Sequence, residues 1–250
     1  MMQSLPGTAA HFVLEALAYA LGARVYWRAA SSLPAPALPD RVLLLGITVF
    51  GAFLGSKLLH VAEHFEVLHA QAGWLPWLAG KSILGGLLGG TLGAELGKKL
   101  VGWRMPTGDP WVPALATGMI VGRIGCQLSG TWDQTYGTPT TLPWAWDYGD
   151  GIGRHPTALY EMLLLALLFL FTRHRAFAGH AGARYAAFLC GYCAVRLGLE
   201  FLKPPFGALA AGSLPVALHG GLTAIQWAAI GGMLWFALLL RTRMTARERT

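Results

Sequence analysis

The sequence predicts an all-α integral membrane protein of about seven transmembrane helices, with its N-terminus outside and its C-terminus in the cytoplasm. Three observations carry this prediction. Hydrophobic residues make up 54% of the chain and charged residues only 12%, about half of the charged share of soluble domains. The mean hydropathy is +0.48. Apolar stretches long enough to cross a bilayer recur throughout, so residues 1–250 are expected to form a single polytopic membrane domain.

Seven segments have the length and composition of membrane spans. They are residues 9–28, 41–62, 74–97, 110–128, 156–173, 184–202 and 221–241. The third segment is rich in glycine, and Gly85, Gly89, Gly93 and Gly97 recur at every fourth position. These glycines share one helix face, and a face of small residues lets two membrane helices pack closely.

Basic residues set the predicted orientation. They gather in every second connection and in the tail: Arg24, Arg28 and Arg41; Lys98, Lys99 and Arg104; Arg173, Arg175 and Arg184; and Arg241, Arg243, Arg247 and Arg249. The other connections carry acids instead, namely Glu63, Glu66, Asp133, Asp147 and Asp150. Because basic residues mark the cytoplasmic side, the N-terminus is expected outside and the C-terminus in the cytoplasm, which requires an odd number of spans. In this orientation, residues from about 129 to 153 are expected to form an outward-facing loop or lid.

Several charged side chains fall in the outer part of the predicted spans or at their outer edge. They are Glu15, Lys57, Lys81, Arg123, Arg154, His155, Glu161, Arg196, Glu200 and Lys203. A charge at mid-span costs at least ~2.5–3.5 kcal/mol, although snorkelling to the interface is an alternative explanation for Lys57 and Lys203. Because most of these charges are cationic and arginine binds phosphate through paired hydrogen bonds, the pattern predicts a site for an anionic phospholipid in the outer leaflet.

Four segments stand out as a set of motifs, namely GRIGCQLSG (122–130), YGTPTTLPW (136–144), RHPTALYE (154–161) and RLGLEFLKPP (196–205). In this order they resemble motifs of the prolipoprotein diacylglyceryl transferase family. The resemblance extends from about Gly80 to Gln226. It implies a multi-pass enzyme of the bacterial cytoplasmic membrane with an outward-facing active site. Such an enzyme moves the diacylglyceryl group of phosphatidylglycerol to the lipobox cysteine of a prolipoprotein and releases glycerol phosphate.

The resemblance implies roles position by position. Arg123 matches the signature arginine that binds the lipid phosphate, and Gly137 matches the glycine that closes the signature. The other matches are Arg154, His155, Tyr160 and Glu161 in an RHPSQLYE-like segment, Arg196 and Glu200 in an RxxxEFFR-like segment, and Gln226 near the start of the last span.

The chain also departs from the family pattern, which indicates a divergent branch. The family signature reads GRxGNFxNGE, and its Asn, Phe, Asn and Glu are replaced by Cys126, Gln127, Ser129 and Thr131. Leu84 stands where the family has the histidine of a His-Gly-Gly segment, its proposed catalytic base. Lys203 replaces the last arginine of the EFFR segment, which keeps the charge but not the paired hydrogen bonds.

Transfer to a thiol needs a base and a stabilised leaving group. The predicted catalytic residues are Arg123, Arg196, His60, His155 and Glu161, with the two arginines at the phosphate and the others as base candidates. The predicted substrate-binding residues are Lys81, Cys126, Gly137, Arg154, Tyr160, Glu200, Lys203 and Gln226. No metal ion, cofactor or nucleic-acid partner is expected.

Alternatives stay open at several of these positions. Glu161 pairs structurally with Arg123 or Arg196 instead of acting as a base, and Cys126 is either a space-filling residue or a nucleophile. His60 and His64 form an interfacial helix face or, within HVAEH, a zinc-peptidase motif.

The predicted partners are phosphatidylglycerol or a related anionic phospholipid, a prolipoprotein acceptor and the membrane itself. The main alternative function is an anionic-lipid-binding protein of the same fold that performs no chemistry or a different reaction. A transporter of an anionic solute is a weaker alternative, because the sequence shows no internal inverted repeat.

Overall fold

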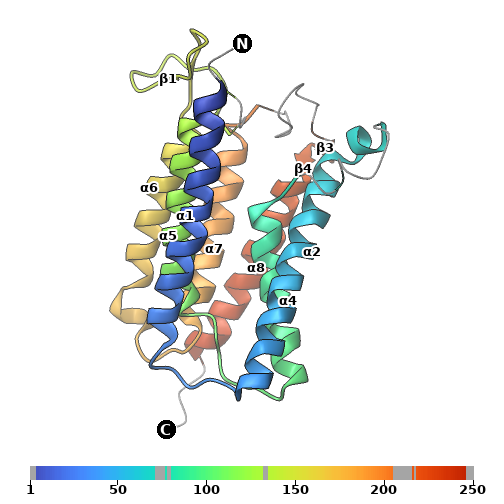
Figure 1. The fold of residues 1–250 in the computed structure, drawn as a ribbon, viewed down its shortest axis with the longest axis vertical. Coiled ribbons are helices and arrows are strands. Elements are labelled where there is room, and N and C mark those ends of the chain that lie inside the picture. Colours follow the sequence, from blue (N-terminus) through green and yellow to red (C-terminus); the bar gives the residue numbers. More distant parts are fainter. Residues whose placement is uncertain are drawn as a thin grey trace.

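The computed structural model describes residues 4–70, 77, 80–131, 135–204, 216 and 218–245. Within them the chain forms seven α-helices that run roughly along one axis (Figure 1). They are α1 (Ser4–Ala30), α2 (Leu38–Ala70), α4 (Ile83–Leu100), α5 (Trp111–Leu128), α6 (Thr157–Thr172), α7 (Ala183–Glu200) and α8 (Ala224–Thr245). Two antiparallel pairs of short strands and a 3₁₀ turn complete the described fold: β1 (Trp146–Asp147) with β2 (Gly153–Arg154), β3 (Leu218–His219) with β4 (Leu222–Thr223), and η1 (Arg175–Phe177).

Each predicted span overlaps one of these helices, and the two largest boundary differences are at the end of α2 and the start of α4. α2 continues past the predicted end at residue 62 to Ala70, through non-helical angles at His64 (φ −121°, ψ 20°). The predicted span 74–97 begins before its helix, since α4 starts at Ile83; residues 74–76 and 78–79 lie outside the described part. The hydroxyl of Ser82 accepts a hydrogen bond from the backbone N–H of Gly85 at 3.3 Å, so a capping side chain fixes this start.

The helices form two groups that α8 joins. α1, α5, α6 and α7 pack together, α2 packs along α4, and α8 contacts α7 on one side and α2 and α4 on the other (Figure 1). The α2–α4 contact is made by glycines: a Cβ on Gly89 would lie 2.3 Å from the carbonyl oxygen of Gly51, and one on Gly55 would lie 2.3 Å from that of Gly85. The predicted small-residue face of α4 is therefore confirmed as a close helix contact, with glycines of α2 as its partner.

The outside of the bundle is apolar. Its exposed large apolar side chains include Val42, Val49, Phe50, Phe53 and Leu58 of α2, Leu163, Leu167 and Leu170 of α6, and Leu234 and Leu238 of α8. Among the described residues, two helical stretches are long and apolar enough by composition to cross a membrane, Leu38–Phe65 and Ala224–Thr245. α4 and α7 carry three charged residues each. Such an apolar exterior is unlike the surface of a soluble monomer.

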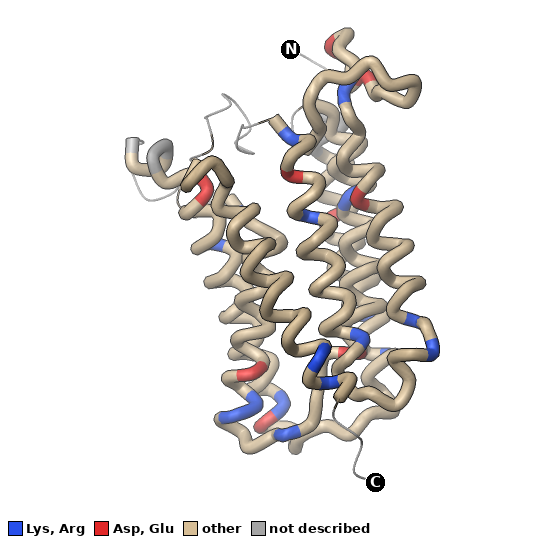
Figure 2. The backbone as a smooth tube through the Cα atoms, turned by 180° about the vertical axis from the view of Figure 1, so that it is seen from behind, with Lys and Arg blue, Asp and Glu red and all other residues tan. Residues whose placement is uncertain are grey.

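Charge is distributed unevenly along the bundle axis. Figure 2 shows Lys and Arg gathered at the end where α4 and α8 finish, which we call the basic end. The opposite end carries the two strand pairs (Figure 1). A second, smaller set of charged positions lies along the helices, nearer to the end opposite the basic end (Figure 2).

Candidate active site

Arg123 and Glu161 form a buried ion pair between α5 and α6. Nη2 of Arg123 lies 3.0 Å from Oε1 and 2.9 Å from Oε2 of Glu161. Glu161 is 1% exposed and Arg123 is 7% exposed, so water does not screen the pair. Small residues next to Arg123 let α1 cover it, because a Cβ on Gly125 would already lie 3.3 Å from Cβ of Leu14. The predicted arginine and glutamate are thus brought together inside the bundle.

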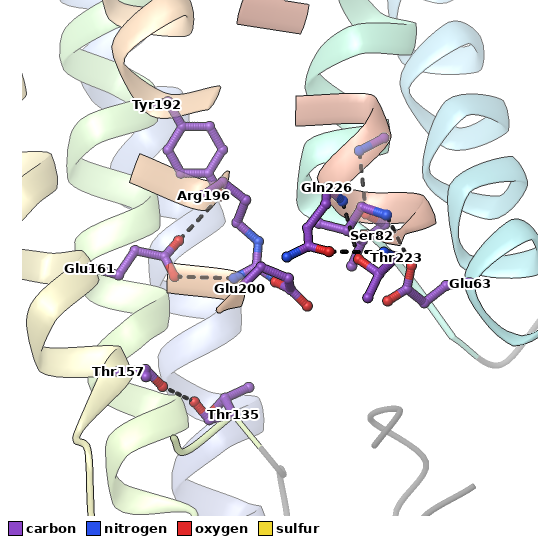
Figure 3. A network of polar contacts seen from close by, with 12 residues as sticks. Glu63, Ser82, Thr135, Thr157, Glu161, Tyr192, Arg196, Glu200, Thr223 and Gln226 are labelled. Carbon is purple, nitrogen blue, oxygen red and sulfur yellow. Dashed lines mark hydrogen bonds and ion pairs between the residues drawn. The ribbon is translucent and has the colours of Figure 1, made fainter. Parts of the chain in front are cut away.

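α7 adds three polar side chains to this pair from one face, because Tyr192, Arg196 and Glu200 follow each other at intervals of four residues (Figure 3). The Tyr192 hydroxyl donates to Oε1 of Glu161 at 3.2 Å, and Nη1 of Arg196 lies 3.9 Å from Oε2 of Glu161. Nη2 of Arg196 lies 2.7 Å from Oε2 of Glu200. We call Arg123, Glu161, Arg196, Glu200 and the neighbouring Lys203 the arginine cluster.

The arginine cluster keeps donors that are not used within the described part of the chain. Nε of Arg123 and Nη1 of Arg196 are buried and have no hydrogen-bond partner there. Lys203 lies past the end of α7, is half-buried, and its ammonium makes no hydrogen bond or ion pair with described residues. Burial next to Arg196 lowers the pKa of Lys203 to about 8. A buried donor without an acceptor is unfavourable by about 1–3 kcal/mol, so these groups favour an anionic ligand.

A cavity of about 190 Å³ adjoins the arginine cluster. Glu200, Lys203 and Gln226 line it, together with the β3–β4 segment and the residues that follow α7. A larger cavity of about 520 Å³ lies near the basic end, away from these residues. We place the candidate active site at the smaller cavity, because it adjoins the buried charges that α5, α6 and α7 bring together.

The N-terminus of α8 forms the far wall of this site. Gln226 accepts a hydrogen bond from the N–H of Thr223 through Oε1 at 2.9 Å, and its own N–H donates to Oγ1 of Thr223 at 3.1 Å. This reciprocal pair is a capping box, so the carbonyl of the predicted substrate-binding glutamine is occupied by the helix start. Figure 3 shows the Gln226 amide between Thr223 and Glu200, where it still faces the site.

Glu63 is a site residue that the sequence did not reveal as such. The prediction that Glu63 lies in an acidic connection outside the spans is wrong. Glu63 lies within α2, is 3% exposed, and accepts a hydrogen bond from the N–H of Ile225 at 2.9 Å. α2 therefore supplies a carboxylate to the start of α8, close to Gln226 (Figure 3). The only sequence signal was the HVAEH segment, in which Glu63 is one helical turn from His60.

His60 lies where α2 passes the start of α4. A Cβ on Gly80 would lie 1.9 Å from Cε1 of His60, so the imidazole packs directly on that glycine backbone. The rings of His60 and His64 are 4.9 Å apart. Nε2 of His60 and Nδ1 of His64 are buried without a hydrogen-bond partner among described residues.

In addition, Lys81 forms an ion pair with Glu15 of α1 and lies exposed at the surface, outside the arginine cluster.

The segment between α5 and α6 is held together by its own charges. Both guanidinium nitrogens Nη1 and Nη2 of Arg154 bond the carboxylate of Asp150 at 2.7 Å, and the guanidinium carbon of Arg154 lies 4.7 Å from the ring centre of Tyr136. These hydrogen bonds hold the pKa of the Asp150 carboxyl below its ordinary value. Arg154, predicted to bind substrate, therefore also closes the β1–β2 loop.

Gly137 lies where three segments touch. Its N–H donates to the carbonyl of His155 at 2.8 Å, and the N–H of Thr138 donates to that of Leu202 at 2.7 Å. A Cβ on Gly137 would lie 2.5 Å from Cβ of His155 and 2.9 Å from the carbonyl oxygen of Leu202. Only glycine fits this approach, so Gly137 holds the loop against the residues that follow α7, next to Lys203.

His155 and Tyr160 face the loop. Nδ1 of His155 lies 3.3 Å from the hydroxyl of Tyr160, which accepts a hydrogen bond from Nε1 of Trp144 at 2.7 Å. Tyr148 of the same loop donates to Oε1 of Gln127 at 3.2 Å, at the end of α5. The described part of the predicted 129–153 loop thus folds over the end of α5 and the start of α6; residues 132–134, including Trp132 and Asp133, lie outside the described part.

The family model for prolipoprotein diacylglyceryl transferase matches residues 11–242 of the chain. The chain belongs to the prolipoprotein diacylglyceryl transferase family. A relative from Bordetella bronchiseptica is 34% identical over 228 residues, which cover 82% of this chain and 84% of the relative. One from Nitrosomonas europaea is 32% identical over 209 residues, covering 76% and 73%. Both are named phosphatidylglycerol–prolipoprotein diacylglyceryl transferase, so the resemblance inferred from the motifs is confirmed.

The departures from the diacylglyceryl transferase signature can now be located. Cys126 lies beside the arginine cluster, with its sulfur 3.6 Å from Nη1 of Arg123, and Ser129 donates back to the carbonyl of Gly125 at 2.7 Å. Leu84, at the position of the family's histidine, is 1% exposed and packs in the core of the bundle. The ring of His60 packs on Gly80, four residues before Leu84. An imidazole therefore lies near the position where the family has its histidine.

Proposed function

We propose that this protein transfers the diacylglyceryl group of phosphatidylglycerol to the thiol of a prolipoprotein lipobox cysteine. The observation that carries the proposal is the arginine cluster, where buried donors that have no acceptor among the described residues adjoin a cavity of about 190 Å³. Family membership supports the reaction type. The names of the relatives supply the two substrates, phosphatidylglycerol and a prolipoprotein.

The charge of the arginine cluster suits a phosphodiester. Arg123, Arg196 and Lys203 are opposed by the carboxylates of Glu161 and Glu200, which leaves one excess positive charge. A phosphatidylglycerol headgroup carries one negative charge, so binding neutralises the cluster. In this arrangement Glu161 and Glu200 orient the guanidinium groups, and Arg123 and Arg196 present free N–H donors to the phosphate oxygens.

The same charges favour the transition state over the bound substrate. The thiol gives its proton to a base, and the thiolate attacks the glyceryl carbon that is bonded to the phosphate oxygen. A C–S bond forms, the C–O bond breaks, and its electron pair leaves on glycerol phosphate. The phosphate thereby gains a second negative charge as the bond breaks, and fixed guanidinium donors stabilise that developing charge. The proton then passes from the base to glycerol phosphate or to water.

His60 and Glu63 of α2 are two base candidates that the packing leaves uncommitted to an arginine, whereas the predicted candidate His155 lies 3.3 Å from the Tyr160 hydroxyl in the loop. Glu161 is bound by Arg123, Arg196 and Tyr192, so its role is to position the cations. His60 has a ring nitrogen without a hydrogen-bond partner among the described residues, and Glu63 lies at the wall formed by α8. We propose that His60 accepts the proton of the thiol, in the place of the histidine that Leu84 replaces.

The proposed setting is the bacterial cytoplasmic membrane, crossed by all seven described helices, with the arginine cluster toward the outer leaflet. The basic end then faces the cytoplasm, as the positive-inside rule requires, and the apolar exterior faces lipid. The loop at residues 135–154 lies at the outer surface, where it forms a lid or a surface for the acceptor peptide.

The test is a transfer assay with purified protein in phosphatidylglycerol nanodiscs. A lipobox peptide is added, its gain of diacylglyceryl mass is followed by mass spectrometry, and glycerol phosphate is measured in the same samples. Arg123→Ala and Arg196→Ala are expected to lower both signals at least about 100-fold, as for loss of a charge-stabilising donor. Arg104→Ala, an exposed arginine outside the site, serves as the matched control and is expected to retain activity.

Two outcomes would contradict the proposal. Phospholipid binding without either product would leave a lipid-binding member of the family that lacks the reaction. Glycerol phosphate release without modification of the peptide, and equally with a Cys→Ser peptide, would show that the acceptor is not the lipobox thiol.

A further inference from the structure

The cavity of about 520 Å³ near the basic end is lined by residues from both helix groups. The end of α1 and the start of α5 contribute Tyr26 and Trp111, whose ring centres are 4.2 Å apart. α2 contributes Arg41, and the ends of α6 and α7 that meet here contribute Arg173 and Arg184. No residue of the arginine cluster lines this cavity. It is therefore separate from the candidate active site.

The three arginines of this cavity have no counter-charge in the described part of the chain. Neither a hydrogen bond nor an ion pair is formed there by the guanidinium groups of Arg41, Arg173 or Arg184; Arg41 lies 5.7 Å from the ring centre of Trp27. Among the described residues that line the cavity, the one acid is Asp109. Its two carboxylate oxygens accept the N–H groups of Gly182 and Tyr185 at 2.8 and 2.9 Å, so Asp109 serves the start of α7 instead.

The remaining lining is mainly apolar. It includes Leu33, Leu44, Leu45, Val112 and Phe169. A soluble anion needs only the charged part of such a cavity, whereas a phospholipid needs a cationic rim for its phosphate and an apolar wall for its acyl chains. Basic pockets between transmembrane helices on the cytoplasmic side are suited to anionic headgroups.

We propose that this cavity binds the phosphate headgroup of an anionic phospholipid from the leaflet at the basic end, as a second lipid site in addition to the active site. Arg41 belongs to the helix group of α2 and α4, whereas Arg173 and Arg184 belong to the group of α1, α5, α6 and α7. A lipid held by all three arginines links the two groups at this end. The bound lipid consequently stabilises their relative position.

The test counts bound lipids by native mass spectrometry of the full chain. Wild type is compared with the triple variant Arg41→Gln/Arg173→Gln/Arg184→Gln at increasing phosphatidylglycerol. The matched control is Lys99→Gln/Arg104→Gln/Arg241→Gln, which removes the same charge from the same end, outside the cavity lining. We expect the cavity variant to bind one phosphatidylglycerol fewer than wild type, and the control to bind the same number as wild type. Arg123→Ala is included, so that loss at the active site is recognised separately.

A thermal unfolding series distinguishes the ligand sources. Phosphatidylglycerol should raise the midpoint temperature of wild type and of the control, and should raise that of the cavity variant by less, since a ligand stabilises only the state that binds it. With phosphatidylcholine or inorganic phosphate, wild type and the cavity variant should show the same change in midpoint temperature. The proposal is overturned if the cavity variant keeps the wild-type number of lipids, if the control loses as many, or if phosphatidylcholine or inorganic phosphate reproduces the shift.

Discussion

Nη2 of Arg123 lies within 3.0 Å of both carboxylate oxygens of Glu161, so one buried carboxylate of α6 holds a guanidinium of α5. Arg196 approaches the same carboxylate from α7. One acid, Glu161, thus holds α5, α6 and α7 together. Without its negative charge, the two guanidinium groups of Arg123 and Arg196 would repel each other.

Replacing Glu161 with glutamine tests this relationship. Glu161→Gln keeps the shape but removes the negative charge between Arg123 and Arg196, and loss of one partner of a buried pair costs about 3–5 kcal/mol. Because 1 kcal/mol shifts the midpoint by about 2–4 °C at this size, we expect thermal unfolding at least about 6 °C lower. Tyr192→Phe, which removes only the 3.2 Å hydrogen bond to Glu161, should change it much less. Equal midpoints for the two variants would show that the ion pair does not hold the helices.

Gly137 provides a second test, of the contact between the loop and α7. Gly137→Ala places a methyl group 2.5 Å from Cβ of His155, so the loop must move away from Leu202 and Lys203. We expect transfer activity to fall at least tenfold and the loop to become more sensitive to limited proteolysis. Gly198→Ala is the control, because a Cβ there meets nothing within 4 Å. Full activity of Gly137→Ala would show that the contact between the loop and the residues after α7 is not needed for transfer.

The pH dependence of the reaction tests Lys203. Its pKa is lowered to about 8, so the cationic form is present below that pH and is lost as the pH rises through it. An arginine at this position stays charged throughout. The ratio of kcat/KM between wild type and Lys203→Arg is therefore expected to be constant up to about pH 7 and to fall between pH 8 and 9. Since ionisation of the acceptor thiol affects both proteins alike, a ratio that is flat to pH 9 would remove Lys203 from phosphate binding.

The identity of the base is tested by single substitutions in α2. His60→Gln should lower kcat by about 100-fold or more with little change in lipid binding, as expected for loss of a general base. Glu63→Gln retains an acceptor for the N–H of Ile225 and should have a smaller effect. His69→Gln, an exposed histidine at the end of the same helix, is the control. A larger loss for Glu63→Gln than for His60→Gln would assign the proton transfer to the carboxylate.

The α2–α4 contact is tested at its narrowest point. A side chain at Gly89 meets the Gly51 carbonyl oxygen at 2.3 Å, which no rotamer can avoid. Gly89→Val is therefore expected to abolish accumulation of folded protein, measured by fluorescence-detected size exclusion in detergent. Gly46→Val lies on the same helix as Gly51 but meets nothing within 4 Å, and should accumulate normally. Normal accumulation of both variants would mean that the helices need not approach this closely.

The sequence predicted more of the helices than of the site. Arg123, Glu161 and Arg196 were identified from their place within apolar segments, and the structure brings them together. The contacts of Lys81 with Glu15 and of Arg154 with Asp150 were not predictable, because either cation could equally have turned toward the phosphate site. Glu63 was missed because an acid near a span end has no distinguishing pattern.

The sequence alone determined that the chain is helical and apolar, where its charges concentrate, and which residue types are available for phosphate. These properties are local: a helix satisfies its own backbone hydrogen bonds, and its composition decides whether it suits lipid. The tertiary structure decided which charges meet, that Gln226 and Glu63 serve the start of α8, and that donors of Arg123 and Arg196 stay unpaired within the described part of the chain. Those outcomes depend on how each helix is rotated about its axis, which is set by close contacts such as that of Gly89 with Gly51.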